Sequence, residues 1–145
     1  MSDAPRQARP RKTLYVGGGV LDGLAQSRAA ARLFHRAGGT IAIGTDCGAP
    51  GTRHGDNARE LALLVDAGLS PLDALRAATA HGATLLGLDD EGRVIEGAHA
   101  DFLIVDGDPT IDIAVVADVA RHRMVVKHGL ALERTELRPA TSASP

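Results

Sequence analysis

The sequence predicts an α/β fold, and three observations lead to that prediction. Thr40–Thr45 is an apolar run without alternation, typical of a parallel strand covered on both faces. Segments with helical spacing of apolar residues flank this run, over 24–37 and 57–68. Beyond it, short apolar runs alternate with glycine-containing turns, which is typical of strands. We therefore expect an α/β part over 13–88, followed by a β-rich part over 90–132.

The composition excludes several classes of protein. The chain has 145 residues, a common size for one domain, and only 2% of them are aromatic. Its formal net charge is −2, so no basic surface for a nucleic acid is expected. No apolar run approaches the roughly 18 residues of a membrane helix, and the single cysteine excludes an intrachain disulfide. We expect a cytoplasmic protein that binds neither nucleic acid nor membrane.

The amino-terminal segment contains a predicted leader, strand and helix. Residues 1–12 are polar and include prolines, which favours a flexible leader. Thr13–Val16 is a short apolar run typical of a strand. A helix is expected over Leu24–Ala37, and Gly38 and Gly39 then end it.

Further helices are indicated by their ends. One is expected to begin near Asn57, because Glu60 follows three residues later as in a capping box. It ends at Gly68, a residue type that commonly terminates helices. The next begins at Ser70, with a proline at its first position and an acidic residue in its first turn. The helical pattern then continues to Leu86.

The carboxyl-terminal part is predicted to be a small sheet. Strands are expected over 92–95, 101–105 and 123–127, separated by glycine-containing turns. Three strands cannot bury both faces by themselves, so either oligomerisation or additional sequence must cover them. The polar tail over 133–145 is expected to be disordered.

Asp46 is the strongest candidate for a functional residue. It follows directly after the buried strand and precedes a loop rich in glycine and proline. Parallel α/β folds gather their reactive groups at this end of their strands. A carboxylate there can bind a metal or transfer a proton, whereas the simpler interpretation is a cap of the turn.

His54 and Cys47 are in the same loop and are weaker candidates. His54 can bind substrate or metal, or it can simply hold the loop in place through its ring nitrogens. Cys47 would need an activating histidine to act as a nucleophile, and a small buried thiol is the simpler interpretation. The other histidines form no His-x-His or His-Glu-x-x-His motif, and we interpret them as structural or surface residues: His35, His81, His99, His122 and His128.

The strand, glycine run and helix over 13–45 also have the outline of a dinucleotide-binding unit. The spacing does not fit, because the third glycine of that motif would fall at Asp22. The acidic residue expected about 20 residues further on is also missing from the matching strand end. A nucleotide-binding protein is therefore a minor alternative.

Taken together, five motifs resemble the C-terminal part of the amidohydrolase superfamily, in its imidazolonepropionase- and prolidase-like branch. Their order and spacing carry the resemblance, which covers residues 24–132. The motifs are GGTIAIGTD (38–46), HGDNAREL (54–61), LVDAGLSPLDALRAAT (64–79), LLGL (85–88) and EGAHADFLIVDGDP (96–109), and VVKHGLAL (125–132) resembles the closing strand of the family.

The resemblance implies a fold. Such enzymes are (β/α)8 TIM-like barrels with a small β-sandwich built from both chain ends. Residues 40–46 would be the last barrel strand, strand eight, and the helices up to residue 88 would follow it. The strands within 90–132 would be the C-terminal share of the β-sandwich.

The resemblance also implies a chemistry. A divalent metal, usually zinc, activates a water molecule that attacks a C–N bond, and Asp46 would contact the metal or the water and transfer the proton. His54 resembles a loop residue that faces the substrate in some members. The substrate would be a small non-peptide amide, cyclic amide or dipeptide-like molecule.

The other residues of the implied metal site are missing from this sequence. The resemblance implies a His-x-His pair, a lysine or glutamate and two more histidines, which would all lie upstream of residue 13. One carboxylate cannot hold zinc, which needs three or four protein ligands. We therefore expect a C-terminal fragment that is inactive alone and lacks an N-terminal half. The alternative from another class is a non-catalytic α/β module that binds a partner or forms a homo-oligomer through its strand edges.

Overall fold

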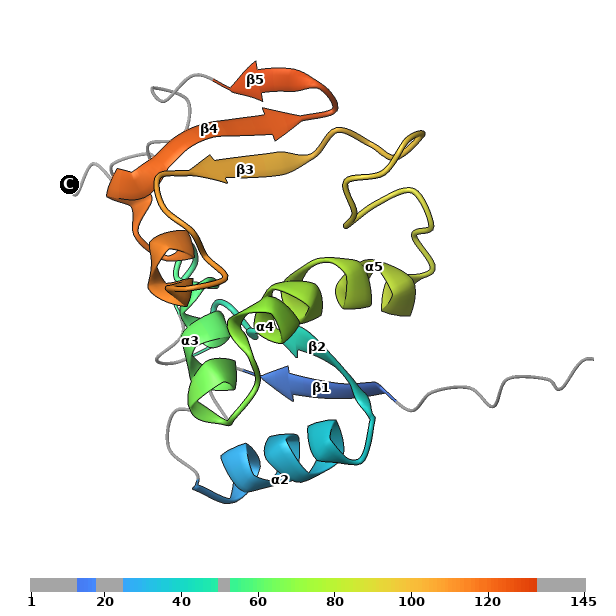
Figure 1. Cartoon of the computed structure of the whole chain (residues 1–145), viewed down its shortest axis with the longest axis vertical. Coiled ribbons are helices and arrows are strands. Elements are labelled where there is room, and N and C mark those ends of the chain that lie inside the picture. Colours follow the sequence, from blue (N-terminus) through green and yellow to red (C-terminus); the bar gives the residue numbers. More distant parts are fainter. Residues whose placement is uncertain (1–12, 18–24, 50–52, 133–145) are drawn as a thin grey trace, which may run out of the picture.

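The computed structural model describes residues 13–17, 25–49 and 53–132. The predicted leader and tail lie outside these residues. Three strands form a sheet at one end of the molecule, helix α2 lies at the other end, and the remaining elements lie between them (Figure 1).

Strands β1 (Thr13–Gly17) and β2 (Thr40–Gly44) are parallel neighbours, joined by a connection that contains helix α2 (Ala25–Arg36). Their register pairs Thr13 with Thr40 and continues without a shift. Consecutive residues of a strand face opposite sides, and Ile41 and Ala42 are both buried. The predicted parallel strand, covered on both faces, is confirmed.

Three short helices follow β2: α3 (Arg59–Asp66), α4 (Pro71–Ala78) and α5 (Ala80–Leu86). The Ser70 hydroxyl accepts a hydrogen bond from the Asp73 backbone N–H, so the predicted cap of α4 is confirmed. The prediction of a capping box at the start of α3 is wrong, because Ala58 is the N-cap and no side chain caps the helix. The side-chain oxygen of Asn57 instead accepts a hydrogen bond from the thiol of Cys47.

The hydrophobic core lies between β2 and the helices. Its members come from α2, β2, α3, α4 and the connections between them, with one addition from the carboxyl-terminal part. They are mostly small or aliphatic, as the scarcity of aromatic residues requires: Ala31, Ile41, Leu61, Leu64, Ala67, Leu69, Ala74, Ala77 and Ile113. This core holds β2 in place and so sets the position of the residues that follow the strand.

The carboxyl-terminal part contains a three-stranded antiparallel sheet in the order β3-β4-β5. The strands are β3 (Phe102–Val105), β4 (His122–Lys127) and β5 (Leu130–Leu132). Two 3-10 helices, η1 (Ile113–Val116) and η2 (Val119–Arg121), precede β4. The described residues of this part form this one sheet, so the second layer of a sandwich stays a prediction.

The strand predicted over 92–95 is wrong, because this segment follows helix α5 instead of joining a sheet. Gly92 has a positive φ of 70° and lies so close to α5 that a Cβ there would be 2.7 Å from the backbone oxygen of Thr79. The Arg93 guanidinium donates hydrogen bonds to the oxygen of Ala80 and to the Thr84 hydroxyl. These contacts hold the segment away from the sheet. Among the described residues, no helix has the length and apolar character to cross a membrane.

Candidate active site at the carboxyl end of strand β2

Asp46 lies two residues beyond the end of β2 and is exposed. Its φ is +50°, a left-handed backbone conformation that residues other than glycine adopt rarely. The Asp46 backbone oxygen accepts a hydrogen bond from the Ala49 N–H at 3.1 Å, which closes a tight turn. The carboxylate therefore lies exposed just beyond the carboxyl end of β2, a strand that the core holds in place.

The residues on either side of Asp46 contact each other through their side chains. The Thr45 hydroxyl and the Cys47 sulfur lie 3.1 Å apart. The same sulfur lies 3.1 Å from the side-chain oxygen of Asn57 and 3.5 Å from the backbone oxygen of Arg53. Cys47 is thus half-buried and hydrogen-bonded, rather than the small buried thiol that the sequence suggested.

His54 lies beside the turn that Asp46 begins. Its side chain is exposed, and its ring faces Gly48, where an added Cβ would lie 3.1 Å from the His54 Nε2 atom. Gly48 is two residues after Asp46, so the fold brings the ring next to the turn that Asp46 begins. An imidazole beside a turn that carries a carboxylate can bind a polar ligand and exchange a proton with it.

The described residues alone do not fit a resident metal ion. No group of three or more histidine, cysteine, aspartate or glutamate side chains among them is arranged to hold a metal. Asp46 offers one carboxylate, and zinc requires three or four protein ligands. Ligation of a metal by Asp46 therefore stays a prediction that needs further ligands.

Each of the other five histidines contacts an acidic side chain or a backbone oxygen of the described chain. His81 and His122 lie at 2.8 and 2.9 Å from the backbone oxygens of Ile41 and Val116, respectively. The others lie within 4 Å of carboxylates: His35 near Asp73, His99 near Asp90 and Glu91, and His128 near Asp101. These contacts agree with the interpretation of the five as structural or surface residues.

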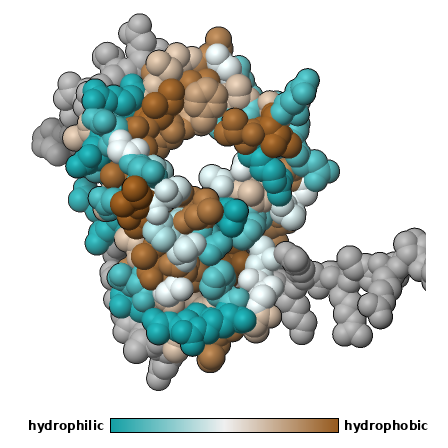
Figure 2. All heavy atoms as spheres, viewed as in Figure 1, coloured by the Kyte–Doolittle hydropathy of each residue, from teal (hydrophilic) through white to brown (hydrophobic). Residues whose placement is uncertain are grey.

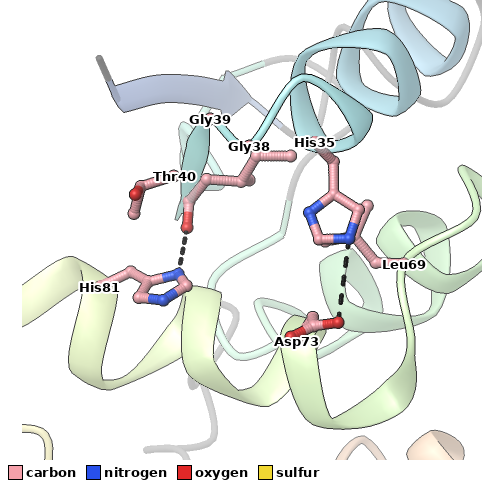
Figure 3. Close-up of a pocket in the computed structure, with 8 residues that line it drawn as sticks. His35, Gly38, Gly39, Thr40, Leu69, Asp73 and His81 are labelled. Atoms are coloured by element: carbon pink, nitrogen blue, oxygen red, sulfur yellow. Dashed lines mark hydrogen bonds and ion pairs between the residues drawn. The ribbon is translucent and has the colours of Figure 1, made fainter. Parts of the chain in front are cut away.

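A cavity of about 200 Å³ lies at the opposite end of β2, beside Thr40 and Ile41. Figure 3 shows His81 on one side of it and the pair of His35 and Asp73 on the other. The cavity is thus separated from Asp46 by the length of the strand. In parallel α/β enzymes the amino ends of the strands serve stability, and the carboxyl ends carry the chemistry. We therefore assign the candidate site to Asp46 and not to the cavity.

The carboxyl groups with a lowered pKa are Asp73, Asp101 and Asp108, and none of them belongs to the loop that contains Asp46. The Ser70 hydroxyl donates a hydrogen bond to Asp73 and, with Arg76 and His35, lowers the pKa of that carboxyl. Hydrogen bonds from the His128 backbone and the Lys127 side chain lower the pKa of Asp101. The hydroxyl and backbone N–H of Thr110 do the same for the pKa of Asp108. All three are structural carboxylates that fix a helix start or a turn.

Sequence reasoning missed the contacts of Cys47. The pattern Asn57-x-x-Glu60 resembles a capping box, and this assigned the side chain of Asn57 to the helix. A cysteine ten residues from an asparagine has no recognisable spacing as a hydrogen-bonding pair. Only the folded loop shows that the two side chains meet.

The comparisons with known proteins give the family. Residues 17–132 match the model of the Amidohydrolase family, which is most of the chain. The chain belongs to this family. The imidazolonepropionase of Streptomyces coelicolor is 38% identical over 86 residues, which are 58% of this chain and 22% of the relative.

Two solved structures of amidohydrolase relatives are similar to the computed structure. The putative prolidase from Bifidobacterium longum is 36% identical, with a TM-score of 0.69 over 74% of this chain and 26% of the other. The ochratoxinase of Aspergillus niger is 26% identical, with a TM-score of 0.70 over 82% of this chain and 31% of the other. This amidohydrolase chain thus spans between a fifth and a third of these relatives' length.

Proposed function

We propose that this chain is the C-terminal part of an amidohydrolase that hydrolyses C–N bonds in small amide, cyclic amide or peptide-like substrates. Family membership over residues 17–132 supports the reaction class. The relatives include an imidazolonepropionase, an ochratoxinase and a putative prolidase, and their sequence identities to this chain are comparable. No single substrate is therefore favoured. The observation that carries the proposal is an exposed carboxylate, Asp46, at the carboxyl end of a buried parallel strand.

Within this proposal β1 and β2 are the last two strands of a TIM-like barrel. Residues 40–46 form strand eight, and the helices up to residue 88 cover it. The strands within 90–132 are one part of a β-sandwich. Two observations support this: the parallel β1-α2-β2 arrangement and the large apolar side chains that the sheet leaves exposed.

Asp46 acts in this proposal as the proton-transfer group. Its carboxylate accepts a proton from the water molecule that attacks the carbonyl carbon, and it donates the proton to the departing nitrogen. The exposed position allows water and substrate to reach the carboxylate, and the turn closed by Ala49 holds its backbone. His54, whose ring lies against Gly48, binds a polar group of the substrate.

Amidohydrolases generally use a divalent metal, which makes a bound water molecule more acidic. In the proposed enzyme Asp46 is one of its ligands, and the others come from outside this sequence. The 145-residue chain is then inactive by itself and binds zinc weakly, because one carboxylate is too few ligands. Metal analysis of the purified chain tests this, and stoichiometric, tightly held zinc would contradict it.

A chimera tests the role of Asp46. Residues 17–132 replace the matching segment of the Aspergillus niger ochratoxinase, and hydrolysis of that enzyme's own substrate is measured. The chimera with Asp46 is expected to be active. Asp46→Asn is expected to lower its kcat by about 10²–10⁴-fold, the typical contribution of a general acid–base group.

The matched control is Asp89→Asn, which changes another exposed carboxylate in the same chimera. Its kcat should equal that of the parent chimera. Circular dichroism and thermal unfolding report whether each chimera is folded. Unchanged kcat in the Asp46→Asn chimera, or a folded parent chimera without activity, would refute the proposal.

A further inference from the structure

Asp46 has a backbone conformation that few non-glycine residues adopt. Only Asp46 and His128 among the described non-glycine residues have a positive φ, and both values are 50°. His128 is in the two-residue turn between β4 and β5, followed by Gly129 with a φ of 77°, and this turn type requires positive φ at both positions. Asp46 follows a strand and is in no such hairpin. Another contact must therefore hold it in this conformation.

The side chains of Thr45 and Cys47 contact each other on either side of Asp46. They belong to the residues directly before and after Asp46, and their oxygen and sulfur atoms are 3.1 Å apart. A thiol has one hydrogen, and the side-chain oxygen of Asn57, 3.1 Å away, can only accept it. The Thr45 hydroxyl then donates to the sulfur, and the sulfur donates to Asn57. Both neighbours of Asp46 are thus held in one hydrogen-bonded chain.

Asn57 connects this hydrogen-bonded chain to the hydrophobic core. It lies two residues before helix α3, and the helix buries Leu61 and Leu64 completely or nearly so. The thiol of Cys47 therefore ties an exposed turn to a helix that the core holds fixed. Between the two, Arg53, Asp56 and Asn57 are all exposed, so their side chains add little buried packing to this connection.

We propose that Cys47 is a positioning residue: through its hydrogen bonds with Thr45 and Asn57 its thiol holds the turn in which Asp46 presents its carboxylate. This inference rests on the proposed function of Asp46. It differs from a nucleophilic role, because the contact with Asn57 needs the proton on sulfur and a nucleophile needs the thiolate. Its described hydrogen-bond partners are a hydroxyl, an amide oxygen and a backbone oxygen, none of which removes a proton.

The first test measures the turn itself in the 145-residue chain. The Ala49 amide donates to the Asp46 backbone oxygen, so its hydrogen-exchange rate by NMR reports on this turn. We expect Cys47→Ala and Asn57→Ala each to raise that rate about fivefold, the effect of one lost hydrogen bond. Cys47→Ser retains a donor and should stay within about twofold of the parent chain.

Exchange of the Ala67 amide is the internal control. It donates to the Leu63 oxygen at the end of α3, remote from the loop, and should not change in any variant. Equal acceleration of both amides would indicate general destabilisation and would overturn the positioning role. So would an unchanged Ala49 rate in Cys47→Ala.

The second test separates this inference from the proposed function. In the ochratoxinase chimera, Cys47→Ala is expected to lower kcat about tenfold with little change in KM, and Cys47→Ser is expected to restore most of it. If Asp46→Asn leaves kcat unchanged, the proposed function fails, and the Cys47 contact is structural only. If Asp46→Asn abolishes activity and Cys47→Ala does not lower kcat, the proposed function stands and the positioning role fails.

Discussion

The α/β region and the carboxyl-terminal sheet bury their apolar residues to very different extents. Leu64 in α3 is completely buried, as are Ala31, Ala74 and Ala77 around it. In the sheet, Val126 is buried, whereas Phe102 and Ile104 are 42% and 43% exposed and Leu130 is 71% exposed. Figure 2 shows apolar side chains on the sheet side of an opening between the sheet and the helices.

This difference indicates that the two regions are not stabilised to the same extent by contacts within the described chain. The α/β region is stabilised by contacts within the described chain, because its helices pack against β2 and against each other. The sheet has hydrogen-bonded strands but little cover for its faces. Burial of apolar area is the main stabilising term in folding. Burial of apolar side chains within this chain therefore stabilises the sheet less than it stabilises the helices.

The largest expected effect is a core truncation in the α/β region. Leu64→Ala should lower the free energy of unfolding by about 3 kcal/mol, because the buried side chain leaves a cavity. Leu130→Ala in the exposed sheet should change it by less than about 0.5 kcal/mol. Urea denaturation followed by circular dichroism measures both. Comparable losses in the two variants would show that the sheet is buried in solution and would break the comparison.

A smaller effect is expected where the two regions meet. Gly92→Ala should lower the free energy of unfolding by about 2 kcal/mol, because the left-handed backbone is strained and the new Cβ collides with the Thr79 backbone oxygen. Gly97→Ala is the matched control, since it has a similar φ of 85° and no atom within 4 Å of the added Cβ. It should cost about 1 kcal/mol. The same denaturation curves measure the difference, and equal costs would mean that the segment does not pack on α5.

The smallest effect concerns pH. Hydrogen bonds from Ser70 and contacts with Arg76 and His35 lower the pKa of Asp73 in the folded chain below its ordinary value. Because the pKa of Asp73 is lower in the folded than in the unfolded chain, its ionised carboxylate stabilises the fold at pH values above the unfolded pKa. This stabilisation is lost as the pH falls through the folded pKa. Asp73→Asn should therefore reduce the loss of stability between pH 7 and pH 3.

Asp101 offers the corresponding test in the sheet. Its lowered pKa, caused mainly by the His128 backbone N–H and by Lys127, has the same sign of pH dependence. Because this carboxylate binds residues of a sheet whose faces are largely exposed, Asp101→Asn should change the pH dependence of global stability less than Asp73→Asn does. Acid titrations of stability measure both variants. A larger change for Asp101→Asn would mean that the hairpin contributes more to global stability than its exposure indicates.

Local patterns were sufficient to predict much of the α/β region. The parallel strand 40–44, the Ser70 cap and the glycine that ends α5 were all predicted, because each depends on residues within a few positions of one another. The prediction of a strand over 92–95 was wrong, because Gly92 and Arg93 contact α5. The local sequence pattern does not reveal these contacts. Asp46 was placed correctly at a strand end, and its role as metal ligand and catalyst stays a prediction.

By itself the sequence determined the order of strands and helices from β1 to α4, the burial of β2 on both faces and the position of Asp46 beyond it. These follow from the spacing of apolar residues and from backbone preferences, which act over short distances along the chain. Only the tertiary structure decided that Cys47 binds Asn57 and that His54 lies against Gly48. These contacts join residues of one loop that share no recognisable sequence spacing, and the packing of the whole chain sets which of them meet.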